Sequence, residues 1–264
     1  MKKLIFCDID GTILDGARGM DDVSHRTRYA IDELKKDNIV IIASGRNRGL
    51  LSGKIIDLRP NGYILCNGAY SELDGKTIHA DYFTDEALEA LKRSTVDHGG
   101  FFFLETLERM YVKNPEDETF RTFARIWGTR MDRVDLEENR TGKCLIAMIG
   151  FADRETFQKT KEELKDVVDL ADHRVFPSCD VNIKGINKAT GVKKIIEYLD
   201  FPLEDTYAFG DAVNDLEMLE NVGHPVIMAN SAAELKGRGF EETGDVLDDG
   251  FYHYLLANKL IKAI

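Results

Sequence analysis

The sequence predicts an α/β protein whose core is a doubly wound parallel sheet, interrupted by an inserted α+β domain. Two observations carry this prediction. Short apolar runs alternate with longer amphipathic stretches near the N-terminus and again from residue 187, which is typical of βαβ units. Between these stretches, runs of strands with helices beside them indicate an antiparallel sheet. We therefore expect the core at residues 1–82 and 184–264 and the inserted domain at residues 83–183.

The N-terminal part of the core follows the pattern of a parallel sheet. Three apolar runs are expected to be its strands: Leu4–Cys7, Ile39–Ala43 and Tyr63–Cys66. Ser24 is a suitable N-cap for a helix between the first two strands, and Arg46–Leu58 fits a second helix. Glu72–Ile78 carries an Asp-Gly turn between short alternating flanks, which predicts a hairpin.

The remaining elements are assigned from the same signals. In the insertion we expect helices at Thr84–His98, Glu116–Trp127 and Asp153–Lys165, and strands at Gly100–Val112, Lys143–Phe151, Val167–Phe176 and Val181–Ile183. In the returning core we expect helices at Asn187–Leu199, Asn214–Glu220 and Phe251–Ile261, and strands at Thr206–Phe209 and Val226–Met228. Aromatic residues of the insertion are expected in its core, with a substrate-facing surface as the alternative: Phe101, Phe102, Phe103, Tyr111 and Trp127. No function is assigned to His98 or His173.

The composition excludes several classes of function. A chain of 264 residues with 43% hydrophobic residues can bury a large core without a disulfide or a metal to hold it. The net charge of −12 disfavours nucleic acid and anionic membrane surfaces as partners. The four cysteines form no CxxC pair, and the apolar run at the N-terminus is too short for a signal peptide. We therefore expect reduced, buried thiols in a cytoplasmic protein that is a monomer or a weak oligomer.

Two carboxylates follow the first strand directly, in the segment Asp8-Ile9-Asp10-Gly11-Thr12. Open parallel sheets bind ligands at the carboxyl ends of their strands, and residues two apart on an extended segment point the same way. Asp8 is therefore a candidate nucleophile and Asp10 a candidate for proton transfer, while Gly11 permits a turn. The alternative is a polar strand end, because Asp, Gly and Thr are common turn residues.

A second acidic pair, Asp211 and Asp215, follows another apolar strand. Helix capping by Asp211 would explain one of these acids and leave Asp215 unexplained. If the four acids of the two pairs converge, their charges would repel an anionic substrate. Mg²⁺ takes carboxylate oxygens and water as ligands, and together with one lysine it would leave a single negative charge. The candidate metal ligands are Asp8, Asp10, Asp211 and Asp215.

Phosphate-binding groups are expected at two further points. Ser44 and Gly45 follow the second strand, where a hydroxyl and backbone N–H groups at the mouth of a helix would form an anion site. Lys188 stands in a first helical turn, where a cation opposes the helix dipole, and the chain re-enters the core there. Ser44 taken alone could be a helix cap, and Lys188 a surface lysine. Because every candidate falls at a strand end or at the re-entry point, we assign all of them to one site.

These motifs resemble those of the haloacid dehalogenase superfamily and, within it, the Cof-like type IIB sugar phosphatases. Asp8–Thr12 is similar to the first motif of that family, DxDGT, and Gly210–Asp215 to the fourth, GDxxND. Ser44 and Lys188 stand where the second and third motifs are expected. The order and spacing of the motifs cover the whole chain.

Two further segments match signatures of the Cof-like group. Asn67-Gly68-Ala69 matches NGA, and Met228-Ala229-Asn230-Ser231 matches M[GA]N[AS]. The chain departs from the family in two respects. Ala212 stands where many relatives have Gly, and the inserted domain offers no motif that we can match, which leaves the substrate open.

The resemblance implies a Rossmann-like core, an inserted C2-type cap domain that selects the substrate, and a two-step reaction. Asp8 would attack the phosphorus, and Asp10 would protonate the leaving alcohol and then activate the water that breaks the aspartyl-phosphate. The implied ligands of Mg²⁺ are Asp8, the backbone carbonyl of Asp10, and Asp211, with Asp215 supporting them. The implied holders of the phosphoryl group are Ser44, Lys188 and Asn214.

We therefore predict a Mg²⁺-dependent phosphatase that acts on small phosphomonoesters, with hexose or pentose phosphates as the expected substrates. Phosphoryl transfer needs positioning and charge neutralisation, and the predicted groups supply both. A phosphomutase on the same core is an alternative enzyme. A phospho-accepting receiver module is an alternative of another class, but such modules lack an inserted domain. A non-catalytic binding protein is disfavoured, because all four catalytic positions are filled.

Overall fold

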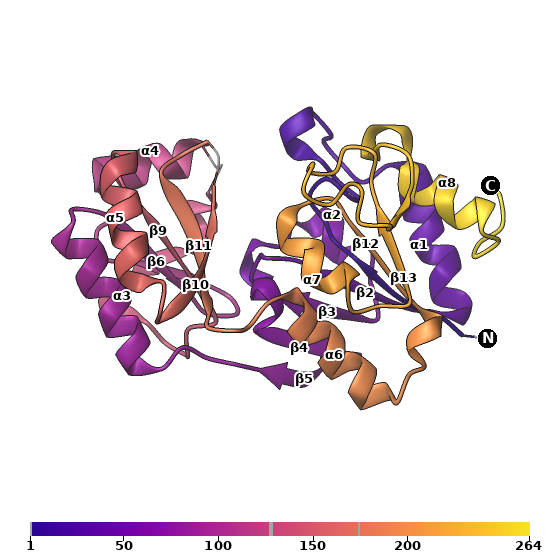
Figure 1. The fold of residues 1–264 in the computed structure, drawn as a ribbon, viewed down its shortest axis with the longest axis horizontal. Coiled ribbons are helices and arrows are strands. Elements are labelled where there is room, and N and C mark those ends of the chain that lie inside the picture. The colour runs from indigo at the N-terminus through magenta and orange to yellow at the C-terminus, as the bar shows by residue number, and fades with distance from the viewer. Residues whose placement is uncertain (1, 127–128, 174) are drawn as a thin grey trace. The chain divides into compact units, whose positions relative to one another are not determined.

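The computed structural model describes residues 2–126, 129–173 and 175–264. These residues form two compact units, each built around its own sheet (Figure 1). The first unit comprises Met1–Gly45, Leu51–His79 and Asn187–Ile264, and the second comprises Arg46–Leu50 and Ala80–Ile186. The predicted fold class, a parallel core sheet with a separate α+β unit, is confirmed. Within the described ranges, no helix has both the length and the apolar character needed to cross a bilayer.

The sheet of the first unit has the strand order β14-β13-β12-β1-β2-β3-β4-β5. Its strands are β1 (Leu4–Cys7), β2 (Ile39–Ala43), β3 (Gly62–Leu65), β4 (Tyr70–Leu73), β5 (Lys76–Ala80), β12 (Thr206–Gly210), β13 (His224–Ile227) and β14 (Glu241–Glu242). From β14 to β3 all neighbours are parallel, and β4 is antiparallel to β3. Chain order reverses between β1 and β12, so this is the point where open α/β sheets bind their ligands.

Helices cover both faces of this sheet. They are α1 (His25–Asp37), α2 (Gly53–Ile56), α6 (Lys188–Leu199), α7 (Leu216–Leu219) and α8 (Gly250–Ala257). Helices α6 and α7 pack on a core that includes Phe6 and Ile41, while the ring of Phe209 on the other face contacts Phe251 in α8. The central strands β1, β2 and β12 are buried along their whole length, which accounts for their apolar sequences. As predicted, Ser24 caps α1, and its side chain accepts a hydrogen bond from the Thr27 N–H.

The prediction of one helix over Arg46–Leu58 is wrong. The chain instead forms a 3-10 turn at Arg48–Leu50 and the short helix α2. The segment Arg46–Leu50 packs within the second unit, where the Gly49 N–H donates to the Leu107 carbonyl at 3.1 Å. A Cβ at Gly49 would lie 1.9 Å from the Glu108 carbonyl oxygen, so only glycine permits this approach. The tertiary contact overrides the local helical pattern.

The second unit holds a six-stranded sheet of order β10-β11-β9-β6-β7-β8. Its strands are β6 (Phe101–Glu105), β7 (Met110–Val112), β8 (Val134–Leu136), β9 (Ile146–Gly150), β10 (Val168–Asp172) and β11 (Ser178–Ile183). Helices α3 (Asp85–Asp97) and α5 (Arg154–Leu164) pack on one face, and α4 (Glu118–Ile126) packs on the other.

Aromatic residues of the insertion form its core, as predicted. Phe101 and Phe103 pack edge-on against Phe120 of α4, with ring centroids 5.7 and 5.0 Å away, and Phe102 and Tyr111 are buried on the opposite face. Trp127, expected in the same core, lies outside the described residues. The strand expected over Gly100–Val112 is a hairpin of β6 and β7, and β8 was not expected from the sequence.

Candidate active site

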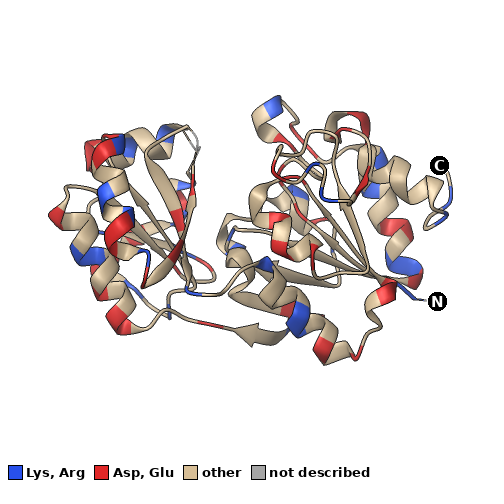
Figure 2. Ribbon diagram, in the orientation of Figure 1, with Lys and Arg blue, Asp and Glu red and all other residues tan. Residues whose placement is uncertain are grey.

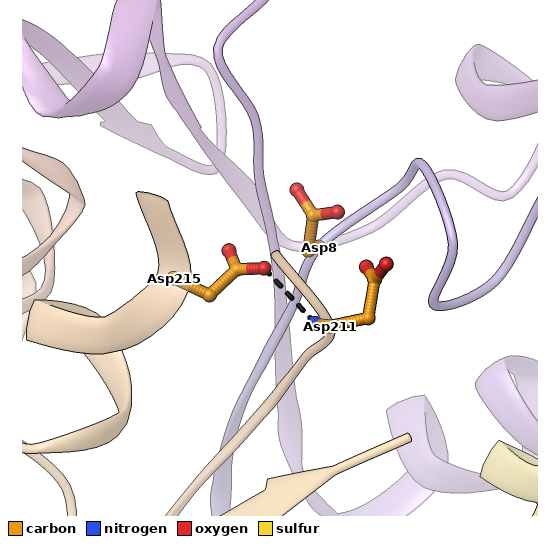
Figure 3. Close-up of side chains that lie close together, drawn as sticks. All are labelled: Asp8, Asp211 and Asp215. Atoms are coloured by element: carbon orange, nitrogen blue, oxygen red, sulfur yellow. Dashed lines mark hydrogen bonds between the residues drawn. The ribbon is translucent and has the colours of Figure 1, made fainter. Parts of the chain in front are cut away.

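Three carboxylates meet at the carboxyl ends of β1 and β12. Asp8 follows β1, and its N–H donates to the Phe209 carbonyl at 3.0 Å, so the ladder between the two strands continues to this residue. Asp211 follows β12, and Asp215 closes the 3-10 turn that comes next. One oxygen from each carboxylate lies within 4.8 Å of the other two (Figure 3). The sequence therefore placed Asp8, Asp211 and Asp215 in one site correctly.

Lys188 is the buried cation of this cluster. It is the first residue of α6, and its side chain is 1% exposed. Its Nζ lies 2.6 Å from Asp8 Oδ1 and 2.6 Å from Asp215 Oδ1. Burial disfavours the charged ammonium group, but attraction to Asp215 and Asp8 prevails and raises the pKa of Lys188. The alternative of a surface lysine is therefore excluded.

Asp215 is held by groups on both of its oxygens. Oδ1 accepts from Lys188, and Oδ2 accepts the N–H groups of Asp211 and Ala212, each at 3.0 Å. Figure 3 shows the first of these contacts, which ties the Asp211 backbone to the Asp215 side chain. This geometry gives Asp215 a supporting function, fixing both Lys188 and the Asp211 backbone.

Asp211 and the turn at Gly11 lie in direct contact. The Thr12 hydroxyl donates to Asp211 Oδ1 at 3.1 Å, and a Cβ at Gly11 would lie 2.1 Å from Asp211 Oδ2. Gly11 also has φ +86, in the left-handed region that favours glycine. The Asp8–Thr12 loop therefore requires glycine here for two reasons, the backbone conformation and the space that the Asp211 carboxylate takes. The Thr12 contact was not foreseen from the sequence.

The cluster is short of positive charge. When all are ionised, three carboxylates and one ammonium group leave two net negative charges in a buried site. Burial raises the pKa of Asp8 well above its usual value, with further repulsion from Asp215, while Lys188 opposes the shift. Burial and Asp215 likewise raise the pKa of Asp211 to about 7. One divalent cation would balance this charge, and oxygen ligands of this kind suit Mg²⁺. The residues present therefore fit a magnesium ion.

Asp10 lies apart from the other three acids. Its side chain is exposed whereas that of Asp8 is buried, and among the described residues the carboxylate cluster does not contain it. Where the sequence predicted that four acids converge, the described residues gather three, and Asp10 is not among them. Only the backbone of Asp10 remains a candidate ligand, and its side chain is placed for contact with solvent or substrate.

Ser44, Gly45 and Asn214 form the other part of the predicted site. Ser44 follows β2, the neighbour of β1, and is buried. Helix α2 begins only at Gly53, so the anion site expected at Ser44 and Gly45 depends on loop N–H groups and not on a helix N-terminus. Asn214 lies in the turn before α7, and its Nδ2 donates to Asn67 Oδ1 at 3.2 Å. Asn67, which the sequence singled out only as part of a motif, thus contacts this group.

Comparisons with known proteins agree with this geometry. Residues 5–255 match the model of the family described as haloacid dehalogenase-like hydrolase. A Bacillus subtilis (strain 168) protein named "Putative phosphatase YkrA" is 31% identical over 265 residues, which cover 98% of this chain and 99% of the relative. A second relative from that organism, 5-amino-6-(5-phospho-D-ribitylamino)uracil phosphatase YitU, is 28% identical over 264 residues, with 96% of each chain covered.

A solved structure shows the same fold. The structure described as that of the HAD subclass IIB sugar phosphatase BT4131 has a TM-score of 0.83 at 21% identity and covers 98% of this chain and 100% of its own. The family match runs through all three segments of the first unit and both segments of the second. The chain therefore belongs to the haloacid dehalogenase-like hydrolases and is a phosphatase.

Proposed function

We propose that this phosphatase is Mg²⁺-dependent and hydrolyses small phosphomonoesters, sugar phosphates in particular, through a phosphorylated Asp8. One observation carries the proposal: Asp8 lies buried at the switch point of the sheet, beside Lys188, with two further carboxylates around it. An oxygen nucleophile, a lysine and a site for a divalent cation are the groups that phosphoryl transfer requires.

In the first step an oxygen of Asp8 attacks the phosphorus of the ester. The bond from Asp8 to phosphorus forms as the bond from phosphorus to the ester oxygen breaks, and the leaving alcohol takes a proton from Asp10. Lys188 fixes the Asp8 carboxylate through Oδ1 and supplies positive charge beside the transferring group. Asn214 and the loop at Ser44 and Gly45 hold the phosphoryl oxygens.

In the second step water hydrolyses the aspartyl-phosphate. Asp10, now deprotonated, takes a proton from a water molecule, whose oxygen attacks the phosphorus and releases inorganic phosphate and the Asp8 carboxylate. The exposed position of the Asp10 side chain supports this function, since proton transfer needs access to both the alcohol and the water.

Asp8, the backbone carbonyl of Asp10 and Asp211 would hold the magnesium ion, with Asp215 supporting Asp211. When bound, Mg²⁺ supplies the charge that allows a phosphate dianion to approach the carboxylates. The two net negative charges of the cluster support this proposal.

Two findings support a small phosphorylated substrate. YitU, the relative at 28% identity, is named for a substrate with a phosphorylated ribityl group, which is sugar-like. Figure 2 shows Lys and Arg interspersed with Asp and Glu along the helices of both units, whereas a nucleic-acid surface gathers basic residues.

We assign substrate selection to the second unit as a cap domain. The four buried cysteine thiols support a cytoplasmic location.

A substrate screen tests this proposal. The enzyme is assayed for release of inorganic phosphate from hexose, pentose, polyol and nucleoside monophosphates, with Mg²⁺ and with a chelator. We expect phosphate release from several sugar or polyol phosphates that stops when the metal is removed. Isomerised sugar phosphate without free phosphate would instead indicate a phosphomutase, and full activity in chelator would contradict the metal requirement.

A further inference from the structure

The turn that follows β3 has an unusual backbone. Three consecutive residues, Cys66, Asn67 and Gly68, have φ of +53, +50 and +95. Residues with a Cβ avoid this left-handed region, although asparagine tolerates it better than most others. Asn67 is also buried. The chain thus keeps a costly conformation that directs a polar side chain into the interior of the first unit.

This turn is fixed at two points beside the predicted phosphate site. The Asn67 N–H donates to the Ser44 carbonyl at 3.2 Å, directly after β2. Gly68 packs against the start of α6, where a Cβ would lie 1.9 Å from the Asn187 carbonyl oxygen. Lys188 is the next residue and the first of α6. Asn67 is therefore fixed relative to Ser44 on one side and to Lys188 on the other.

From this position the Asn67 side chain fixes Asn214. Asn67 Oδ1 accepts a hydrogen bond from Asn214 Nδ2 at 3.2 Å, across 147 positions of sequence. An amide has two N–H donors, so an Asn214 held through one of them presents the other in a defined direction. A Cβ at Gly45 would lie 3.0 Å from the same Asn67 oxygen, so this oxygen also lies beside the loop N–H groups.

We propose that Asn67 is a positioning residue, which orients the Asn214 amide toward the phosphoryl group. The inference rests on the proposed function of Asn214 as a phosphoryl-binding group. It gives the NGA segment a specific function: Asn67 supplies the acceptor oxygen, and Gly68 permits the close approach to α6 that places it. Asn67 itself does not contact the substrate.

The variant Asn67→Gly tests this proposal, because glycine keeps the left-handed backbone and removes only the side chain. With p-nitrophenyl phosphate and Mg²⁺, we expect kcat to fall by roughly tenfold to a hundredfold while KM changes less than about threefold. Asp200→Gly is the matched control, since Asp200 is an exposed residue at φ +47 that ends α6. That control is expected to retain wild-type kinetics.

A second variant, Asn67→Asp, keeps an acceptor oxygen for Asn214 and adds a negative charge beside Gly45. We expect kcat to stay within about threefold of wild type and KM to rise, because the charge repels phosphate while the orientation is kept. If Asn67 only stabilises the turn, kcat of the folded Asn67→Gly protein would remain at the wild-type value, and this would overturn the inference.

A double-mutant cycle with Asn214→Ala separates this inference from the proposed function. If Asn67 acts through Asn214, Asn67→Gly should lower kcat less than about threefold in the Asn214→Ala background. Full activity of Asn214→Ala would remove the proposed function of Asn214. If Asn214→Ala lowers kcat strongly and Asn67→Gly lowers it by the same factor in both backgrounds, only the positioning by Asn67 would be contradicted.

Discussion

Lys188 Nζ lies 2.6 Å from Asp8 Oδ1, although the two residues are 180 positions apart in the sequence. The ion pair joins the end of β1 to the start of α6, and Asp215 shares the same ammonium group. Positive charge is therefore supplied to Asp8 from the point where the chain returns from the second unit to the first.

Replacement of Lys188 by alanine should impair both catalysis and stability. We expect Lys188→Ala to lower kcat at least a hundredfold, since one fixed charge at the transition state is worth roughly 3 to 4 kcal/mol. Loss of the cation also leaves Asp8 and Asp215 buried side by side, so Tm should fall as well. Steady-state kinetics and thermal unfolding measure the two effects. A loss of less than tenfold in kcat would remove Lys188 from its assigned function.

Replacement of Asp8 by asparagine should abolish turnover and preserve binding. The amide is a poor nucleophile, but it removes a negative charge and keeps the shape of the side chain. We expect Asp8→Asn to show no turnover and still to bind inorganic phosphate in the presence of Mg²⁺, as measured by calorimetry. Residual turnover near the wild-type rate would show that another group attacks the phosphorus.

Removal of the Asp211 charge should stabilise the metal-free protein. Above its raised pKa of about 7, Asp211 is ionised, and both the burial of this charge and its repulsion from Asp215 cost free energy. At pH values above about 7, we expect Asp211→Asn to raise Tm in chelator by roughly 2–4 °C. We also expect this variant to lose the increase in Tm that Mg²⁺ gives the wild-type protein. An undiminished Tm increase with Mg²⁺ would show that Asp211 is not a ligand.

Glu105 should make stability depend on pH. Burial and the charge of Asp180 raise the pKa of this carboxyl from 4.5 to about 8 in the folded protein, where Asn47 donates to it at 2.9 Å. Between pH 4.5 and about 8, the folded state holds a proton that the unfolded state has lost. The free energy of unfolding therefore falls as pH rises through this range, by up to about 1.4 kcal/mol per pH unit.

The matched variant for this prediction is Glu105→Gln, which cannot ionise. Urea unfolding of wild type and variant at several pH values should give a difference that grows with pH in favour of the variant and levels off above about 8. A difference that is constant with pH would show that Glu105 has an ordinary pKa in the folded protein.

The sequence predicted the core strands and all three acids of the cluster, together with Asp10, for a physical reason. Continuous apolar runs identify buried parallel strands, and the acids that follow β1 and β12 must meet at one edge of the sheet because those strands are neighbours. Lys188 was found by its position at the re-entry point, where a helix dipole disfavours a cation without a local purpose.

Other features depend on tertiary contacts that local sequence does not encode. The Arg46–Leu58 pattern is helical, but the close approach of Gly49 to the Glu108 carbonyl breaks it. Asp8 and Asp10 are two positions apart on one loop, yet Asp8 is buried and Asp10 is exposed. The contact of Asn67 with Asn214 joins two segments that are distant in sequence. The NGA motif marked Asn67 as a residue of interest, but it did not indicate which residue Asn67 contacts.

The stereochemical course at phosphorus tests the two-step reaction through Asp8 most directly. Each displacement inverts the configuration, so two successive displacements restore it. Hydrolysis of a chiral, isotopically labelled thiophosphate ester is therefore predicted to release thiophosphate with retained configuration. Inverted thiophosphate would show that water attacks the substrate in one step and that Asp8 never carries the phosphoryl group.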